Sequence, residues 1–224
     1  MAGYGFRCRN DNTTYQIDAV HPTYVLRRKA VITLAGGYSQ NDLSAIVGRT
    51  TDTGINQVSG DMMFVNTSGW HAVVPTAVTN NHRIYQPPGS PSVQATVYVF
   101  NTVTNAPQPS STHGLRIRNT AGQIIFESGW NLCKIKGAFN FDSSSAASWG
   151  QTFDRPVAVA GFSPYVRYNN TREYLQYFEM YFRVEGNSVY MQEQHSYSYD
   201  EPGTWANGTS QGSNFIVVCD TRLL

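Results

Sequence analysis

Apolar and polar side chains alternate with a period close to two along most of this 224-residue chain. A β-strand places successive side chains on opposite faces, whereas a helix repeats its face about every 3.6 residues. Phe6 and Cys8 alternate with arginines, for example, and polar residues 10–13 then lead into a second alternating run at residues 15–18. This pattern predicts an all-β fold that contains many hairpins.

The composition supports the same fold class and argues against a nucleic-acid binder. The chain is rich in Tyr, Phe, Val and Thr, which suit pleated surfaces, and in Gly, Ser and Asn, which suit turns. Charged residues make up 14% of the chain, and the net charge is +1. Nucleic-acid binding needs a basic stripe, and the one basic run, residues 27–29, is interpreted as a solvated strand edge. We therefore expect no nucleic-acid partner.

A repeat divides the chain into halves. The hexapeptide GFRCRN at residues 5–10 returns as GLRIRN at residues 114–119, and each copy begins a predicted hairpin. The closing strands of both halves end in similar pairs, Asn101-Thr102 and Asp220-Thr221, so the spacing grows from 109 (114 − 5) to 119 (220 − 101). We predict two tandem β-sandwich-like domains that arose by internal duplication. The alternative is one large β-sandwich with coincidental resemblance between strands.

The predicted domain boundaries follow from a polar, Pro-rich stretch. Residues 105–113 are expected to be a linker that holds the domains 1–104 and 114–224 apart without packing. Strands are predicted at residues 25–26, 30–34, 62–65, 70–74, 93–103, 115–118, 123–127, 132–136, 139–141, 181–184, 188–191 and 215–219.

Some segments carry more specific expectations. Residues 62–65 with 70–74, and 181–184 with 188–191, are predicted to form corresponding hairpins, with Trp70 as a cross-strand packing residue. Residues 41–47 are the one candidate for a short helix, capped by Asn41. Residues 173–184 have both helical and strand character, and their Tyr and Phe content favours a strand.

Sequence motifs of enzymes are absent. The sequence contains no Gly-x-Ser-x-Gly elbow, calcium loop, P-loop or dinucleotide fingerprint. The nearest elbow-like stretch is interrupted by Pro164. The five histidines form no close pair. Carboxylates that converge from distant strands stay open as an alternative. We therefore predict no catalytic residue, no metal site and no cofactor.

The three cysteines, Cys8, Cys133 and Cys219, form no CxxC motif and lie among apolar neighbours. They are predicted to be buried free thiols, which suits a reducing site of synthesis. Residues 1–4 lead straight into a strand-like pattern, so no signal peptide is expected. No apolar run approaches the roughly 20 residues of a membrane helix, and no membrane insertion is expected.

Two predicted loops carry candidate binding residues. Residues 195–208 place aromatic side chains beside Ser, Gly and Asn, the composition of a recognition loop. The candidates there are Tyr197, Tyr199, Asp200, Trp205 and Asn207. A second loop, residues 143–150, adds Trp149. In the alternative interpretation these aromatic residues close the end of a sandwich or lie in a subunit interface, and residues 143–150 are a flexible connection between strands.

The opening of each half resembles a known family. Residues 114–128, GLRIRNTAGQIIFES, fit the form Gly-Leu-x-(Val/Ile)-x-Asn-x-x-Gly-x-x-(Ile/Val)-(Phe/Leu)-(Asp/Glu)-Ser, and thereby resemble small β-rich tail proteins of tailed bacteriophages. The first half opens with Tyr4-Gly5-Phe6-Arg7 and departs from the form at Thr13, which stands in place of the turn glycine. The resemblance covers only the opening hairpin of each half and carries no functional residue over to this chain.

The resemblance implies a non-enzymatic component of a phage virion, made in the host cytoplasm and placed in the tail tip or fibre. Its expected partners are copies of itself, as a trimer or hexamer, and other tail proteins, with a host surface glycan or protein as a further candidate. The first domain would serve attachment and the second would face outward. Two other function classes stay open. A lectin-like module would lose sugar affinity on Trp205→Ala, and a polysaccharide esterase or glycosidase would need a serine or acids.

Overall fold

The structure is a computed structural model, and it describes residues 5–9, 14–18, 23–36, 50–73, 80–105, 107, 114–141, 148–162, 166–170, 175–199, 208–209, 214–222 and 224. The backbone alone is described for residues 5–9, 14–18, 162, 166–170, 175–177, 195–199, 208–209 and 214. The fold is all-β, as predicted, and the only helical segment in the described residues is the 3-10 turn η2 (Val103–Asn105).

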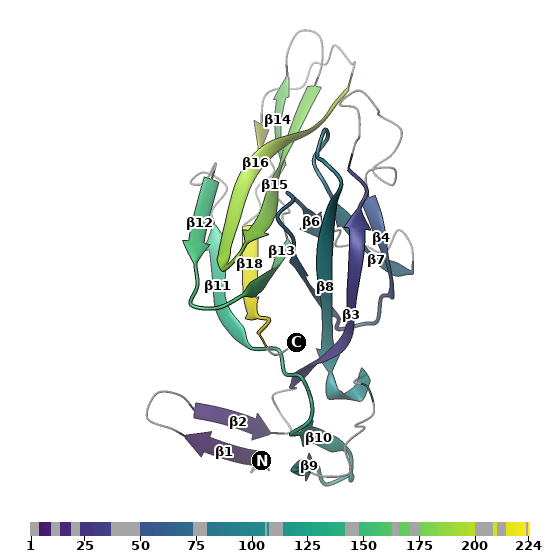
Figure 1. The fold of residues 1–224 in the computed structure, drawn as a ribbon, viewed down its shortest axis with the longest axis vertical. Coiled ribbons are helices and arrows are strands. Elements are labelled where there is room, and N and C mark those ends of the chain that lie inside the picture. The colour runs from purple at the N-terminus through teal and green to yellow at the C-terminus, as the bar shows by residue number, and fades with distance from the viewer. Residues whose placement is uncertain are drawn as a thin grey trace.

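A six-stranded antiparallel sheet forms the first layer of a β-sandwich (Figure 1). Its order is β11 (Ile135–Phe141), β18 (Asn214–Asp220), β13 (Val157–Phe162), β5 (Met62–Asn66), β8 (Val93–Thr102) and β3 (Tyr24–Leu34). Three of these strands come from each half of the chain, and β5 pairs with β13 through Val65 and Val159. The halves therefore share one sheet, which differs from the expectation that a linker holds them apart.

The second layer also crosses between the halves. A five-stranded sheet has the order β12 (Ser148–Thr152), β16 (Ser188–Tyr199), β15 (Leu175–Glu185), β14 (Val166–Asn170) and β17 (Gly208–Thr209). A three-stranded sheet has the order β4 (Thr50–Asn56), β7 (Asn81–Tyr85) and β6 (Ala72–Val73). His71 and Phe182 exchange two backbone hydrogen bonds of 2.8 Å, and Val184 N–H donates to the Thr67 carbonyl at 2.7 Å. These bonds join the two sheets into one layer.

Alternate residues of the six-stranded sheet point between the layers and form two cores, one for each half. The first-half core comprises Leu34, Ile55, Met63, Val65, Ile84, Ala95, Val97 and Val99. The second-half core comprises Val157, Val159, Met180, Phe182, Val184, Val189, Met191, Ile216 and Val218. The period of two in the sequence arises because every second side chain of these strands is buried between the layers.

The opposite face of the same sheet carries a third core. Phe64, Phe100, Ala158 and Cys219 are fully buried there, and Phe64 and Phe100 meet edge to face with ring centroids 5.5 Å apart. This third core is buried because the sheet curves. The start of edge strand β3 pairs with residues 131–133, and these residues lead into the other edge strand, β11. The sheet therefore closes on itself at one end, around this core.

Two small hairpins lie beyond that closed end (Figure 1). β1 (Gly5–Arg9) pairs with β2 (Thr14–Asp18), and β9 (Arg116–Arg118) pairs with β10 (Ile124–Glu127). β10 also lies beside β2. Both hairpins were predicted from the sequence and are confirmed, and we call the pair of them the base.

The strands of the two halves correspond. In each half the last strand lies between the first and third strands of the sandwich, giving β3-β8-β5 and β11-β18-β13. Each first strand has a bulge at the matching place, at Arg27 and at Lys136, which are 109 residues apart (136 − 27). Internal duplication stays a prediction, and this correspondence supports it. Of the linker, the structure describes only Asn105 and Pro107, and the boundaries 1–104 and 114–224 stay predictions.

Several local predictions are corrected. Residues 62–65 and 70–74 do not form a hairpin, because β5 and β6 belong to different layers and residues 67–71 cross between them. Residues 25–34 form one bulged strand rather than two. The hairpin of β15 and β16 is confirmed, and 175–184 is strand. The predicted short helix at residues 41–47 lies outside the described residues.

Candidate functional site

The carboxylate of Asp61, directly before β5, is the buried centre of a polar cluster. Its side chain is 1% exposed. Arg27 donates twice to it, from Nε to Oδ1 at 3.0 Å and from Nη2 to Oδ2 at 2.6 Å. The ring Nε2 of His82 lies 2.8 Å from Oδ2, and Asn101 Nδ2 donates to Oδ1 at 2.6 Å. The backbone N–H of Val58 donates to Oδ2 at 2.9 Å.

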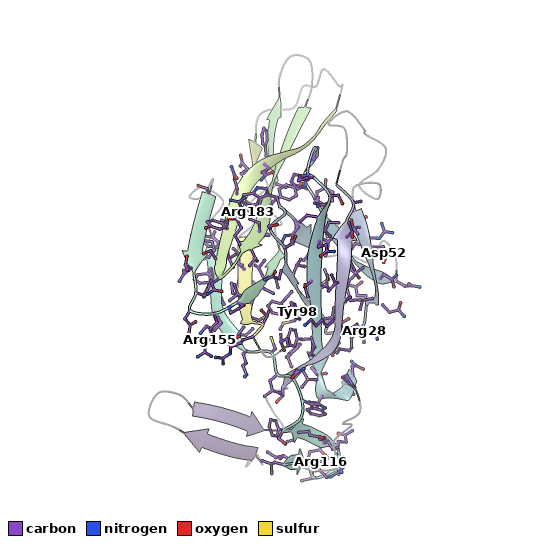
Figure 2. All side chains as sticks on the ribbon, viewed as in Figure 1. Arg28, Asp52, Tyr98, Arg116, Arg155 and Arg183 are labelled. Atoms are coloured by element: carbon purple, nitrogen blue, oxygen red, sulfur yellow. The ribbon has the colours of Figure 1, made fainter. Side chains whose placement is uncertain are left out.

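Arg27 reaches Asp61 because of the β3 bulge. Leu26 pairs with Phe100 and Arg28 pairs with Val99, so Arg27 has no partner on β8 and turns toward the β4–β5 connection. The interpretation of residues 27–29 as a solvated edge is therefore wrong for Arg27, whose side chain is 17% exposed. It holds for Arg28, which Figure 2 shows on the edge strand β3. It also holds for Lys29, which is exposed on the same strand.

The hydrogen bonds set the charge of Asp61. Burial by itself raises the pKa of the carboxyl, but donors from Arg27, Asn101, His82 and Val58 favour the ionised form and together hold the pKa below its ordinary value of 3.8. The cluster therefore contains a carboxylate whose lone pairs are all directed at groups of its own fold.

The same groups hold the connecting turn in place. Arg27 Nη2 donates to the Asn56 carbonyl at 2.6 Å, and Gln57 N–H donates to the Asn80 carbonyl at 2.7 Å. Asn101 Nδ2 also donates to the Ser59 carbonyl at 3.1 Å. Gly60 has a φ of +85°, a conformation that favours glycine. Hydrogen bonds to the backbone thus hold this turn in place at nearly every residue.

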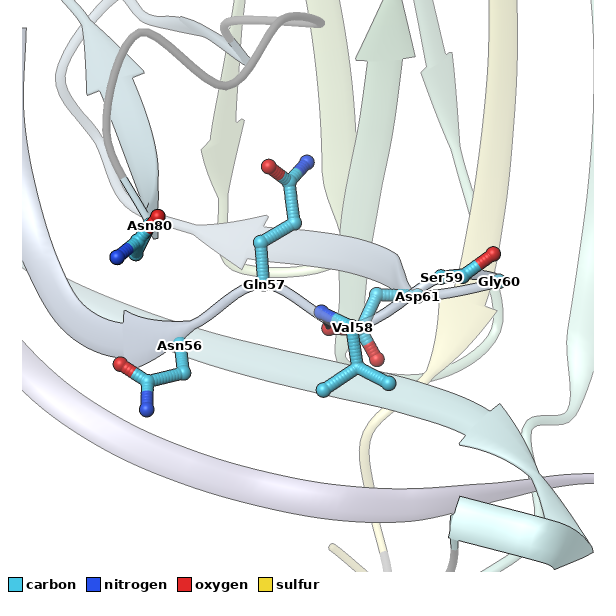
Figure 3. Close-up of a pocket in the computed structure, with 7 residues that line it drawn as sticks. All are labelled: Asn56, Gln57, Val58, Ser59, Gly60, Asp61 and Asn80. Atoms are coloured by element: carbon cyan, nitrogen blue, oxygen red, sulfur yellow. Dashed lines mark hydrogen bonds between the residues drawn. The ribbon is translucent and has the colours of Figure 1, made fainter.

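A pocket of about 590 Å³ opens over this turn (Figure 3). It is lined by Asn56, Gln57, Val58, Ser59, Gly60, Asp61 and Asn80. The carboxamides of Asn56, Gln57 and Asn80 have no hydrogen-bond partner in the part of the chain that the structure describes. They extend from three separate backbone positions around the turn (Figure 3).

This site was not predicted from the sequence, because the predicted binding loops are marked by aromatic residues and this turn has none. The available signal was the carboxamide-rich stretch Gly54-Ile55-Asn56-Gln57 followed by Ser59-Gly60-Asp61, with Asn80-Asn81 before the next strand. Only the fold brings Asn80 beside Gln57.

The predicted binding residues at 195–208 are not brought together as a described loop. By its backbone, Tyr197 pairs with Tyr177 and Tyr199 pairs with Leu175, both within the β15–β16 hairpin. The loop prediction is therefore wrong for residues 195–199, which continue strand β16. Asp200, Trp205 and Asn207 lie outside the described residues.

Trp149 packs into the protein. It lies on β12 and pairs with Met191, and its ring centroid is 4.9 Å from that of Phe139 and 5.1 Å from that of Phe141. The prediction of a loop is therefore wrong for residues 148–150. Alternation along β12 turns Trp149 toward the second-half core, where it packs as a partly buried residue.

Two polar contacts lie at the junction of the halves. His71 is 1% exposed, and its Nδ1 is 3.2 Å from the Gly69 carbonyl, while its buried Nε2 has no hydrogen-bond partner among the described residues. Burial lowers the pKa of His71 to about 4. Arg183 places its guanidinium carbon 4.6 Å from the Trp70 ring centroid and 5.1 Å from the Tyr190 ring centroid. Trp70 therefore packs across the halves, not across a hairpin.

The prediction of buried free thiols is confirmed for Cys219, which is free and fully buried. Cys133 is also free, but it is only partly buried. Burial raises the pKa of the Cys133 thiol to about 12 and that of Cys219 further. The side chain of Cys8 lies outside the described residues.

The described residues lack metal-binding clusters and membrane-spanning helices. They contain no group of three or more His, Cys, Asp or Glu side chains arranged to hold a metal ion. They also contain no helix with the length and hydropathy needed to span a membrane. Comparison of the chain with protein-family models, with curated proteins and with solved structures gives no match.

Proposed function

We propose that this chain is a non-enzymatic structural component of a tailed-phage virion, in the tail tip or fibre, where it links tail parts and contacts copies of itself. The proposal rests on the resemblance of the opening hairpins to phage tail proteins and on the place of those hairpins in the fold. Both lie together beyond one end of a continuous sandwich (Figure 1). A virion subunit needs a rigid body and a separate joining surface, and this arrangement supplies both.

The observation that carries the proposal is the hydrogen bonding of the base. Within the described part of the chain, each hairpin forms a two-stranded sheet of its own. A two-stranded sheet has marginal stability alone, and a sheet edge can accept a strand from another chain. Leu115 at the start of the second hairpin is 49% exposed, which adds apolar surface at the same place.

The test is the mass of the full-length chain in solution, measured by light scattering over a range of concentrations. We expect a trimer or hexamer, and we expect Leu115→Asp to lower the mass. The matched control is Val31→Asp on β3, since Val31 is even more exposed, at 63%, but lies away from the base. A monomer at every concentration would count against the proposal, as would an equal effect of both substitutions.

A further inference from the structure

β12 is an edge strand of the second layer with one free side. It pairs with β16, and within the described residues no strand lies on its other side (Figure 1). Directly after β12, Phe153 N–H donates to the Asn187 carbonyl at 3.0 Å. Because hydrogen-bonded and non-hydrogen-bonded pairs alternate along an antiparallel ladder, the backbone N–H and C=O groups of Ser148, Gly150 and Thr152 point away from β16. This free edge therefore offers the backbone groups of all three residues to another strand.

The free edge of β12 carries no charge. Its sequence is SWGQT, and four of its five residues are exposed. The other long edge strands of the described sandwich carry exposed charges, with Arg28 and Lys29 on β3 and Lys136 on β11. Such charges keep a sheet edge from pairing with its own copy, because like charges would lie side by side. β12 lacks this protection.

The matching side of the first half is closed. Directly after β3 in the first layer, Ala35 N–H donates to Thr51 Oγ1 of β4 in the second layer, at 3.1 Å. β11 and β12 hold the matching places in the second half, and no hydrogen bond joins these two strands in the part of the chain that the structure describes. The link there is an ion pair of 2.8 Å between Lys136 and Asp154, whose side chain is 60% exposed. This side of the second half is therefore open.

An aromatic group lies on the open side. Trp149 of β12 meets Phe139 and Phe141 of β11, with ring centroids 4.9 and 5.1 Å apart. Phe153 lies 6.4 Å from Phe139. All four rings are only partly buried. Apolar surface therefore lies beside the free edge of β12, where a strand added to that edge would cover it.

We infer that β12 pairs with β12 of a second copy of this chain, antiparallel and about a two-fold axis at Gly150. Ser148 of one copy then lies opposite Thr152 of the other, and their outward backbone groups bond to each other. Gly150 places no side chain at the axis, where the two backbones meet. A second copy fits this edge because the strand is neutral and meets no like charge in that register. The two five-stranded sheets become one, with both aromatic groups on the same face.

This inference deepens the contact between copies in the proposed function and rests on it. The surface is a different one, because the base lies beyond the closed end of the six-stranded sheet and β12 lies at the side of the sandwich (Figure 1). A chain with Leu115→Asp, which disrupts the base, should therefore still form a dimer through β12. The two contacts can be removed separately.

The experiment places charges on β12 of the full chain and measures mass by light scattering over a range of concentrations, with and without Leu115→Asp. Ser148→Lys combined with Thr152→Lys sets like charges opposite each other on both sides of the axis. We expect this variant to raise the dissociation constant of the β12 contact about tenfold. The matched control, Ser148→Lys combined with Thr152→Glu, sets opposite charges at the same places and should leave the contact at least as tight. Both variants change the same two exposed positions, so an effect on folding would appear in both.

A dimer of the Leu115→Asp chain that the double-lysine variant dissociates and the lysine–glutamate variant retains supports the inference. Equal masses of the two charge variants would overturn it, as would a Leu115→Asp chain that is a monomer at every concentration. Fast hydrogen exchange of the Ser148, Gly150 and Thr152 amides in the assembled protein would also overturn it, and would leave the edge open to a strand of another protein.

The same measurements separate this contact from the base. A trimer or hexamer that Leu115→Asp dissociates and the double-lysine variant does not would overturn the β12 contact alone. A dimer that responds only to the charges on β12 would overturn the base contact alone.

Discussion

The backbone N–H of Cys133 donates a hydrogen bond of 2.9 Å to the carbonyl oxygen of Tyr24. This bond lies between the starts of two strands, β3 and β11, that form opposite edges of the same six-stranded sheet. Leu26 N–H donates to the Asn131 carbonyl at 2.7 Å beside it. The two bonds close the sheet at one end, and the third core is buried inside the closed part.

The closed end of the six-stranded sheet limits the reactivity of the Cys133 and Cys219 thiols. Because burial raises the pKa of Cys133 and Cys219, little thiolate forms at about pH 8, and Cys219 is also inaccessible. We expect iodoacetamide to leave Cys219 unmodified in the folded protein and to label Cys133 slowly, with both labelled fast in urea. Peptide mass spectrometry gives the rates, and native labelling of Cys219 at the urea rate would contradict the closed end.

Removing the Asp61 carboxylate should lower the free energy of unfolding. Asp61→Ala leaves Arg27 and His82 without their shared acceptor and releases the β4–β5 turn, so we expect the free energy of unfolding to fall by about 3 kcal/mol. The control is Glu185→Ala, whose carboxylate is 45% exposed and paired with Arg183, with an expected loss below about 1 kcal/mol. Urea denaturation measures both, and equal losses would show that the buried cluster adds no more stability than an exposed ion pair.

The buried His71 is expected to lower the free energy of unfolding in mild acid. The pKa of His71 is lowered in the folded state, so the unfolded chain binds the extra proton between pH 6.5 and about 4. Stability is therefore complete above about pH 6.5 and falls as the pH drops toward 4, by up to roughly 3 kcal/mol from this group. Urea denaturation at a series of pH values tests the slope.

His71→Gln is the control for that slope, because the amide does not titrate. We expect the variant to lose most of the pH dependence above pH 4. The lowered pKa of Asp61 acts in a separate window, since its contribution is present above its ordinary value of 3.8 and is lost only below it. An unchanged slope in His71→Gln would assign the acid sensitivity to another group.

The contact between layers at Gly161 leaves no room for a side chain. A Cβ at this position of β13 would lie 2.3 Å from the Phe182 ring, in the second-half core. Gly161→Ala should therefore destabilise the protein by about 2 kcal/mol, through overpacking. Ala160→Gly, one residue away on the opposite face, should cost less than about 1 kcal/mol. Thermal denaturation compares the two, and a neutral Gly161→Ala would show that Phe182 can move aside.

Local pattern was sufficient for the strands whose partners are close in sequence. Alternation and a polar turn identified the β1–β2, β9–β10 and β15–β16 hairpins, because both the turn and the buried face lie within one short segment. The bulges at Arg27 and Lys136 were not predicted, although they lie 109 residues apart (136 − 27), as the two opening hexapeptides do. Residues 62–74 show the limit, since a turn-like sequence there crosses between layers instead of reversing the chain.

The sequence by itself determined the all-β class, the period of burial and the likeness of the two halves, because these follow from the order of side chains along each strand. Only the tertiary structure decided which strands from different halves share a sheet, how Trp149 packs, and that Asn80 lies beside Gln57. The physical reason is that alternation shows that a strand has a buried face but does not name the partner that buries it. Pairs such as Val65 with Val159 depend on how the whole sheet curves and closes.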